Sequence, residues 1–350
     1  MNSNQTTTIL SIQHLRGIAA LMVVWHHARE QIAGLTNFFP GSFGASGVDI
    51  FFVISGFIMV VTTTGRTMTP FQFMGKRIAR VVPLYWLLTI LMVCIWMAKP
   101  TVFRTLQVSE TSLLQSLFFF PHFSAAFPEQ AWPLLVPGWT LNYEMFFYLV
   151  FASTLFLPER FRLVGITLTL LIFVASGTLF GPFKSAALKT YTDPLLLEFL
   201  AGSWIGYLWG RHRLSLPRSI SLVCALAGFS LLIARNGEAL GVFTQILGAA
   251  LLIIGALNCK FPSFMNVFLR ALGDASYSLY LTHIFTLGIF RYVWVKLNGT
   301  TQTLYDGGVF MLASVSACTV VGLLVFRFVE SPMTVKLNQV FFDPPKVSVV

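Results

Sequence analysis

Charged residues are scarce in this chain of 350 residues, in which 10% are Asp, Glu, Lys or Arg and 56% are hydrophobic. Soluble globular domains carry about 25% charged residues, so the composition excludes a soluble domain. Acidic residues are the scarcer kind, with 13 against 23 basic residues and a formal net charge of +10. The basic residues lie scattered between apolar runs and form no stripe, which argues against nucleic-acid binding.

Cysteine is also rare, and its spacing carries no chemistry. Cys94, Cys224, Cys259 and Cys318 lie in or at the edges of separate apolar runs, without CxxC or CxH spacing. This pattern predicts neither a disulfide framework nor a metal site, and we expect no metal. The first ten residues, MNSNQTTTIL, lack a basic region, so we expect the first apolar run to be a retained helix and not a cleaved signal.

Apolar runs of about 20 residues recur along the chain and predict an all-α membrane bundle of about ten transmembrane helices. The predicted spans are 11–29, 47–65, 81–98, 139–157, 161–180, 194–210, 217–235, 240–258, 277–296 and 307–329. The stretch 111–127 is short and interrupted by proline, so we interpret it as interfacial or re-entrant. One membrane domain over residues 1–335 and a short tail, 336–350, account for the chain.

Sidedness follows from the loops between these spans. An even number of spans puts both termini on the same side of the membrane. If that side is the cytoplasm, the inner loops hold about twice as many lysines and arginines as the outer loops, as the positive-inside rule requires. We therefore expect both termini to be cytoplasmic.

The first span, LRGIAALMVVWHHA (15–28), carries an arginine near one end and two histidines near the other. Ionisable groups at membrane depth cost about 2.5–3.5 kcal/mol each on insertion scales, so they suggest a functional site. Arg16 and His27 are separated by about three helical turns, which puts them on one face with roughly 16 Å between them. The alternatives are that Arg16 snorkels to the inner headgroups, that His27 marks the outer interface, or that His26 is the functional histidine.

Two carboxylates are predicted near the depth of His27. Asp49 enters the second span in GASGVDIFFVISGF (44–57), and Glu144 follows Asn142 and Tyr143 in GWTLNYEMFFYLVF (138–151). A carboxylate beside an imidazole fixes its tautomer and raises its basicity, as a general base requires. The alternatives are that Asp49 caps its helix and that Glu144 belongs to a structural pair.

Basic residues cluster in FMGKRIARVVPLYW (73–86), which we predict to be an inner loop followed by a span with Pro83 in its first turn. Arg77 and Arg80 are spaced to share one helix face. Two guanidinium groups so arranged suit a polyphosphate at the cytoplasmic surface, because each binds phosphate in a bidentate manner. The alternative interpretation is a topology anchor.

Two further polar segments lie near the end of the chain. In LGDASYSLYLTHIF (272–285), Asp274 is predicted to cap a span that carries His283 about two turns inside. His283 either belongs to the site or forms a helix–helix hydrogen bond. In FRFVESP (326–332), Arg327 and Glu330 suggest an interfacial ion pair, and Pro332 is expected to end the last span.

These motifs, in this order, resemble acyltransferase family 3, and within it the O-acyltransferases of exopolysaccharide production. The family's arginine, ten residues, histidine pattern fits Arg16 and His27, and its R-x-x-R element fits Arg77 and Arg80. The blocks GVDIFFVISGF, WTLNYE and ASYSLYLTH fit as well. Two features depart from the larger O-antigen-type members: the block WTLNYEMFFY differs from their WSLSVEEQFY, and we expect no counterpart of their fused extracytoplasmic esterase-like domain.

The resemblance implies transfer of an acyl group, usually acetyl, from cytoplasmic acyl-CoA to a hydroxyl of a cell-surface or lipid-linked carbohydrate. It implies a multi-pass protein of a bacterial-type inner membrane, with acetyl-CoA as co-substrate. Arg16, Arg77 and Arg80 would bind coenzyme A. His27 would act as the base, oriented by Asp49 or Glu144, or would itself be acylated transiently; we favour the base because it needs no stable acyl-imidazole. Asn142, Tyr143 and His283 would contact the substrate.

Two other classes of protein fit the composition. A transporter or flippase for a lipid-linked saccharide or small anion also needs many spans and buried polar groups, although we find no inverted repeat that favours one. A structural membrane subunit gives no reason for Arg16, His27, Asp49 and Glu144 to lie at membrane depth.

Overall fold

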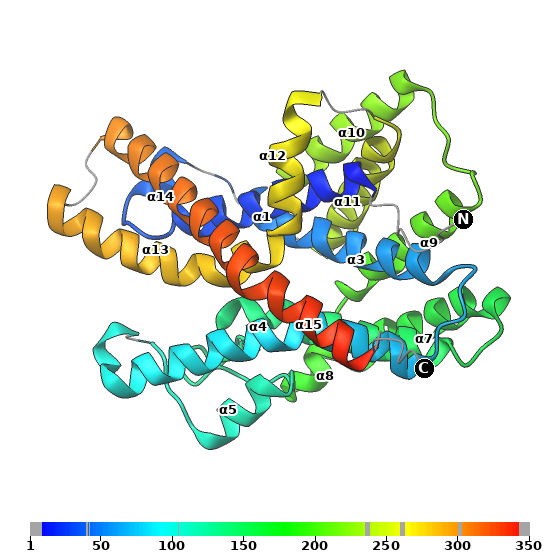
Figure 1. Cartoon of the computed structure of the whole chain (residues 1–350), viewed down its shortest axis with the longest axis horizontal. Helices are drawn as coiled ribbons and strands as arrows, with labels where there is room; N and C mark the ends of the chain where they lie inside the picture. The colour runs from blue at the N-terminus through cyan, green and yellow to red at the C-terminus, as the bar shows by residue number, and fades with distance from the viewer. Residues whose placement is uncertain are drawn as a thin grey trace, which may run out of the picture. The chain divides into compact units, whose positions relative to one another are not determined.

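The computed structural model describes residues 9–39, 41, 43–103, 105–234, 239–259, 263–299 and 303–342. These ranges contain helices joined by turns and bends and no strand, which confirms the predicted all-α class (Figure 1). Four basic residues of the predicted loops lie outside these ranges: Arg104, Arg235, Lys260 and Lys346. The chain divides into two compact units, unit 1 (Met1–Thr64 and Leu197–Phe326) and unit 2 (Gly65–Leu196 and Arg327–Val350), and each is described by itself.

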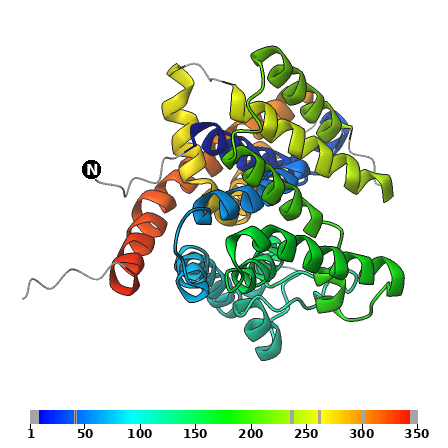
Figure 2. The ribbon, with the colours of Figure 1, turned by 90° about the vertical axis from the view of Figure 1, so that its right-hand side faces the viewer.

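Unit 1 is built around its first helix, α1. It contains α1 (Leu10–Ala28), α2 (Leu35–Phe38), η1 (Phe43–Ser46), α3 (Gly47–Thr63), α9 (Leu196–Gly210), α10 (Arg218–Ile233), α11 (Ala239–Asn258), α12 (Ser263–Asp274), α13 (Ser276–Asn298) and α14 (Leu304–Val325). Helices α13 and α14 pair side by side (Figure 1), and so do α10 and α11 (Figure 2). Helix α1 contacts α3, α11, α12, α13 and α14.

Glycines let neighbouring backbones approach α1 closely. A Cβ atom on Gly44 would lie 2.4 Å from the Met22 carbonyl oxygen, and one on Gly47 would lie 2.4 Å from that of Ala19. On α12, a Cβ on Gly273 would lie 2.1 Å from the Gln13 carbonyl oxygen. Small residues at such contacts allow the van der Waals packing that holds membrane helices together.

Helices α3 and α9 cross at a similar contact. A Cβ on Gly56 would lie 2.0 Å from the Phe199 carbonyl oxygen, and one on Gly202 would lie 1.9 Å from that of Val53. The Phe52 and Phe199 rings stack beside the crossing with their centroids 4.5 Å apart. Because each glycine faces rigid backbone of the other helix, neither position has room for a side chain.

Unit 2 is built around the longest helix, α4. It contains α4 (Pro70–Ala98), η2 (Pro100–Val102), α5 (Glu110–Leu117), η3 (Val136–Gly138), α6 (Trp139–Thr154), α7 (Glu159–Phe180), α8 (Ala186–Tyr191) and α15 (Ser331–Phe341). Helices α4 and α6 run antiparallel, since Phe73 stacks on Phe151 with ring centroids 5.0 Å apart while Tyr85 contacts Gly138. A π-helical turn, η4 (Phe326–Glu330), connects α14 to α15 along the chain.

Helix α4 begins well before the predicted span, so the prediction of a loop around Arg77 and Arg80 is wrong. Its N-cap is Thr69, which forms a capping box with Gln72, and a proline follows at the first helical position. Both arginines therefore lie within the helix. Pro83 lies inside the helix and not in its first turn. The apolar run marked only the second part of a helix whose 29 residues extend over about 43 Å.

Two predicted helix ends are also wrong. Asp274 is the last residue of α12 and does not cap α13, which begins at Ser276 after Ala275. Pro332 does not end the last helix, because the chain continues from η4 into α15, where a proline in the first turn loses no intrahelical hydrogen bond. Glu330 is buried in the π-helical turn.

Each of the predicted spans coincides with a helix, but fewer are long and apolar enough to cross a membrane by themselves. Among the described residues these are Phe43–Thr63, Pro70–Ala98, Glu159–Phe180, Gly241–Asn258 and Leu304–Phe341, with Arg218–Ile233 as a shorter apolar helix. Helices α1 and α13 have 19 and 23 residues, yet their composition leaves them out of this group. The number of spans stays a prediction.

The segment 111–127 is not a spanning helix. Its helix, α5, has 8 residues, and the chain then turns at Phe119, whose φ is 56°. The Leu117 carbonyl oxygen accepts a hydrogen bond of 2.7 Å from the Trp86 indole, and the Phe119 ring packs on Tyr85. This irregular stretch thus lies against the middle of α4.

We predict that Gly202→Ala destabilises the protein, because the new methyl group meets the Val53 carbonyl oxygen, which cannot move without shifting α3. Overpacking of this kind costs about 1–3 kcal/mol. The measurement is the thermal unfolding midpoint of the purified protein in detergent. Gly288→Ala is the matched control, because Gly288 lies in α13 with nothing within 4 Å of the added atom. Equal midpoints for the two variants would contradict the close α3–α9 contact.

Candidate functional site

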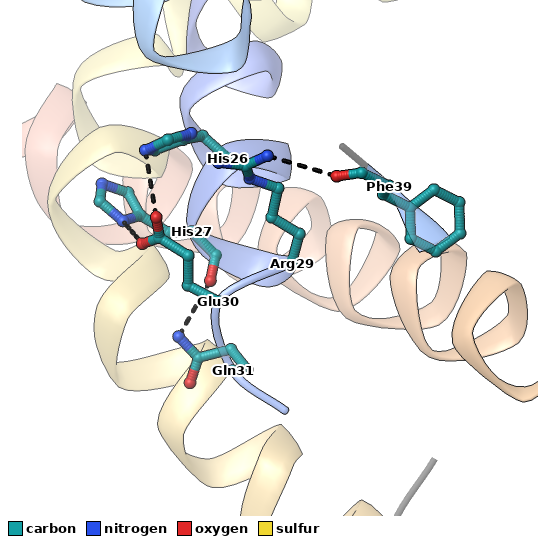
Figure 3. A network of polar contacts seen from close by, with 6 residues as sticks. All are labelled: His26, His27, Arg29, Glu30, Gln31 and Phe39. Atoms are coloured by element: carbon teal, nitrogen blue, oxygen red, sulfur yellow. Dashed lines mark hydrogen bonds and ion pairs between the residues drawn. The ribbon is translucent and has the colours of Figure 1, made fainter. Parts of the chain in front are cut away.

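Two histidines and a glutamate meet at the C-terminal end of α1, and we call them the Glu30 cluster: His26, His27 and Glu30 (Figure 3). The His26 Nε2 atom lies 3.4 Å from one Glu30 carboxylate oxygen. The His27 Nδ1 atom lies 3.4 Å from the other oxygen. A single carboxylate therefore serves both imidazoles, whose ring centroids are 5.2 Å apart.

The chain just beyond α1 is held in place by its neighbours. Gln31 Nε2 donates a hydrogen bond of 3.0 Å to the His27 carbonyl oxygen, which α1 leaves without an intrahelical partner (Figure 3). Arg29 Nη1 donates to the Phe39 carbonyl oxygen at 3.2 Å. These two bonds on either side of Glu30 fix the turn that presents its carboxylate to the rings.

Glu30 is a residue of this cluster that the sequence prediction lacks, because that prediction places the carboxylate partners of His27 on other spans. The signal was local: Glu30 follows His27 by three residues and His26 by four, the spacings at which side chains meet on a helical turn. The His27 imidazole beside it lowers the pKa of the Glu30 carboxyl below its ordinary value. Glu30 therefore stays ionised at neutral pH and further into acid.

His283 of α13 brings a third imidazole to His27. The two rings are stacked, with centroids 5.1 Å apart and planes 23° apart. His283 is fully buried, and its Nδ1 donates a hydrogen bond of 2.6 Å to the Tyr280 carbonyl oxygen. Because a carbonyl can only accept, the His283 hydrogen is on Nδ1 and Nε2 is left as an acceptor. That Nε2 atom has no hydrogen-bond partner among the described residues.

Arg16 lies toward the other end of α1 and links it to the start of α13. Its guanidinium donates to Ser276 Oγ at 2.9 Å and to Gln13 Oε1 at 3.1 Å. Gln13 in turn donates to the Asp274 carboxylate at 3.1 Å. Arg16 is thus fixed against protein groups at this end of α1, which argues against free snorkelling to the headgroups.

Asp49 is buried in the first turn of α3, with 2% of its surface exposed. The N-cap of that helix is Ser46, so the capping alternative for Asp49 is wrong. The first residue of α3, Gly47, packs against Ala19 and Val23 of α1, between one and just over two helical turns before His27. A role of Asp49 in orienting His27 stays a prediction. The contact of His27 with the Glu30 carboxylate is present in the structure.

Arg77 and Glu144 are neighbours in unit 2. The Arg77 guanidinium carbon lies 5.4 Å from the centre of the Phe73 ring and 6.0 Å from that of Tyr148. The Tyr148 hydroxyl donates a short hydrogen bond to the Glu144 carboxylate. The expectation that Arg77 lies on the inner side and Glu144 in the outer half does not hold for this pair. Arg80, one turn further along α4, is half-buried and has no ion pair among the described residues.

Asn142 and Tyr143 lie in the first turns of α6 and are both buried. The Tyr143 hydroxyl donates to the Asp193 carboxylate at 3.3 Å, and its ring packs edge-on against Trp139. Burial raises the pKa of Asp193. Tyr143 thus helps to anchor the turn before α9, and its predicted contact with substrate remains a prediction, as does that of Asn142.

The predicted site residues fall into two groups. Unit 1 holds Arg16, His27, Asp49 and His283, and brings His27 and His283 into contact. Unit 2 holds Arg77, Arg80, Asn142, Tyr143 and Glu144, and brings Arg77 and Glu144 together through Tyr148.

Comparison with known proteins gives a family and several relatives. The family model for an acyltransferase domain, acyltransferase family 3, matches residues 9–327. The exopolysaccharide production protein ExoZ of Rhizobium meliloti is 39% identical over 300 residues, which are 83% of this chain and 89% of that protein. The peptidoglycan O-acetyltransferase OatA of Listeria monocytogenes is 25% identical, and the match covers 92% of this chain and 55% of that protein.

A second relative of this kind, the O-acetyltransferase OatA of Staphylococcus aureus, is 24% identical, with 95% of this chain and 58% of that protein covered. The chain thus spans little more than half the length of the OatA proteins. No solved structure matches the chain. The family model extends over both units and includes every predicted site residue. The chain therefore belongs to acyltransferase family 3, as its motifs indicated.

Proposed function

We propose that this protein is a membrane O-acyltransferase that moves an acyl group, most simply acetyl, from cytoplasmic acyl-CoA to a hydroxyl of a cell-surface or lipid-linked carbohydrate. The observation that carries the proposal is the Glu30 carboxylate beside Nδ1 of His27, in a chain that belongs to an acyltransferase family. The printed names of ExoZ and OatA, exopolysaccharide production and peptidoglycan O-acetylation, support a polysaccharide acceptor. The transporter alternative has no comparable support.

His27 is the proposed general base. In the proposed reaction His27 carries its hydrogen on Nδ1, which faces the Glu30 carboxylate 3.4 Å away, so that the lone pair of the neutral ring lies on Nε2. This is the relation between carboxylate and imidazole in which the carboxylate fixes the tautomer and stabilises the imidazolium that forms. Glu30 acts through His27 and is therefore a positioning residue. Asp49, buried in the first turn of α3, would add negative charge, and the expected role of Glu144 in orienting His27 stays a prediction.

The proposed reaction needs one proton carrier. Nε2 of His27 takes the proton from the acceptor hydroxyl as its oxygen forms a bond to the thioester carbonyl carbon. The tetrahedral intermediate collapses with cleavage of the carbon–sulfur bond, and the coenzyme A thiolate takes the proton back from the imidazolium. An acyl-histidine route would put the acyl group on Nε2 first. We favour the base because it requires no acyl-imidazole intermediate.

The remaining residues would hold the two substrates. The unpartnered Nε2 of His283 is an acceptor beside His27, which suits a hydroxyl donor on the carbohydrate. Asn142 and Tyr143 are proposed as further substrate contacts. Arg77 and Arg80 would bind the coenzyme A phosphates and Arg16 would line its path, since paired guanidinium groups recognise phosphate oxygens.

We predict that His27→Ala lowers kcat by about 10²–10⁴-fold, the usual contribution of a general base, whereas His26→Ala stays active. Glu30→Gln should lower kcat with little change in KM for acyl-CoA, and Glu30→Asp should recover part of the loss. The measurement is transfer from radiolabelled acetyl-CoA to lipid-linked oligosaccharides by the purified protein in detergent.

Gel filtration of each variant in detergent is the control for folding. Wild-type activity in a folded His27→Ala variant would rule out the mechanism. A loss in Glu30→Gln that appears only in KM would remove Glu30 from its positioning role and leave His27 as the base.

We predict that Arg80→Ala weakens coenzyme A binding, measured by calorimetry, and that wild-type affinity falls as salt rises. Arg80→Lys should recover part of the affinity, because the charge remains while the bidentate geometry is lost. Arg80 is substituted in preference to Arg77, because Arg77 also packs on Phe73 and Tyr148 and its loss would disturb that packing. Arg66→Ala, in the exposed turn before α4, is the control. Equal affinities for Arg80→Ala and Arg66→Ala would favour the topology-anchor interpretation.

We predict that both termini are cytoplasmic, so that acyl-CoA enters from the cytoplasm. In a variant without native cysteines, a cysteine at Asn37 should react with a membrane-impermeant maleimide in intact cells, and one at Thr67 should not. Both positions are exposed, and Thr67 avoids the capping residue Thr69. The reverse labelling pattern would invert the topology and place Arg77 and Arg80 away from the coenzyme A pool.

A further inference from the structure

The Glu30 cluster has the composition and the geometry of a metal site. Its two imidazole nitrogens and its carboxylate each offer one ligand atom, and these atoms lie within 4.8 Å of one another. Bonds of about 2.0–2.1 Å in a tetrahedral zinc site put neighbouring ligand atoms about 3.3–3.4 Å apart. Each imidazole nitrogen lies 3.4 Å from a Glu30 oxygen, and the two oxygens are different atoms of the carboxylate. To bind one ion through both imidazoles and a single carboxylate oxygen, the ligand atoms must close from their present spread of up to 4.8 Å, and Glu30 lies in an exposed turn where its side chain can rotate.

The same distances are long for direct bonds between the groups. A charge-assisted hydrogen bond from an imidazole to a carboxylate measures about 2.7–2.9 Å. Here each imidazole nitrogen lies 3.4 Å from a different Glu30 oxygen, which is longer than such a hydrogen bond (Figure 3). Two nitrogen ligands and one oxygen ligand, with a fourth position for water or substrate, form a set typical of zinc.

The surroundings also favour a cation. The cluster lies at the C-terminal end of α1, where the helix dipole carries partial negative charge. The side chains of Glu30 and His27 are 45% and 39% exposed, so an ion can enter from solvent. Arg29, the neighbouring cation, donates a hydrogen bond to the Phe39 carbonyl oxygen.

We propose that His26, His27 and Glu30 bind Zn²⁺ and that the bound ion inhibits the transferase. The metal would take Nδ1 of His27, and a neutral imidazole bound through Nδ1 carries its hydrogen on Nε2. Nε2 then has no lone pair with which to accept the hydroxyl proton. Glu30 is withdrawn at the same time from its positioning role. The inhibition rests on the proposed function of His27, whereas the binding does not.

The binding is tested on the purified, metal-free wild-type protein in detergent by calorimetry with Zn²⁺. We expect one site, and a loss of affinity of more than about 10-fold in His26→Ala and in Glu30→Gln, because even outer-shell partners of a metal contribute about 10–100-fold. His122→Ala is the control, since His122 lies in unit 2 and outside the cluster. Absence of binding, or equal affinity in His26→Ala and His122→Ala, overturns the site.

The inhibition is tested by acetyl transfer with and without Zn²⁺ at a concentration that saturates the wild-type site. We expect the wild type and His122→Ala to lose activity, and His26→Ala to stay active in both conditions, because it keeps His27 and Glu30 but lacks one ligand. Full wild-type activity with the site saturated overturns the inhibition. An active His27→Ala variant would refute the proposed function instead, and the calorimetry would still decide the metal site.

Discussion

Close backbone contact around α1 is the constraint on which unit 1 depends. Lipid is as apolar as a leucine side chain, so membrane helices gain little from burying apolar surface and associate through packing and polar contacts. Gly44, Gly47 and Gly273 supply that packing by letting neighbouring backbones touch α1. The contacts fix α1 along its length and, with it, Arg16 at one end and the Glu30 cluster at the other.

The helical class could be predicted from composition, because apolar runs of membrane length admit few other structures. The residues at which the helices begin could not be predicted from these apolar runs. An apolar run reports where side chains avoid water, whereas the start of α4 is set by the cap at Thr69 and by Pro70. Both signals are present in the sequence, but Pro83 lies nearer to the apolar run, and a proline there predicts a later first turn.

The site was predictable where its residues share one helix. The spacing of Arg16 and His27 is a property of α1 alone, and Glu30 was open to the same reasoning. Contacts between helices were not predictable from the depth of residues in the membrane, because two residues at equal depth can point toward or away from each other. The stacking of His283 on His27 and the link from Arg77 through Tyr148 to Glu144 depend on how helices pack.

The crossing of α3 and α9 has a mechanical consequence. Gly56 of α3 and Gly202 of α9 each face a carbonyl oxygen of the opposite helix, so a shift of either helix disturbs both contacts. Sliding α3 by four residues, about 6 Å, would bring Phe52 or Val60 to the place where only Gly56 fits against α9. Shear between these helices is therefore blocked, and the pair behaves as one rigid element. Any opening motion in unit 1 that admits a substrate has its hinge elsewhere.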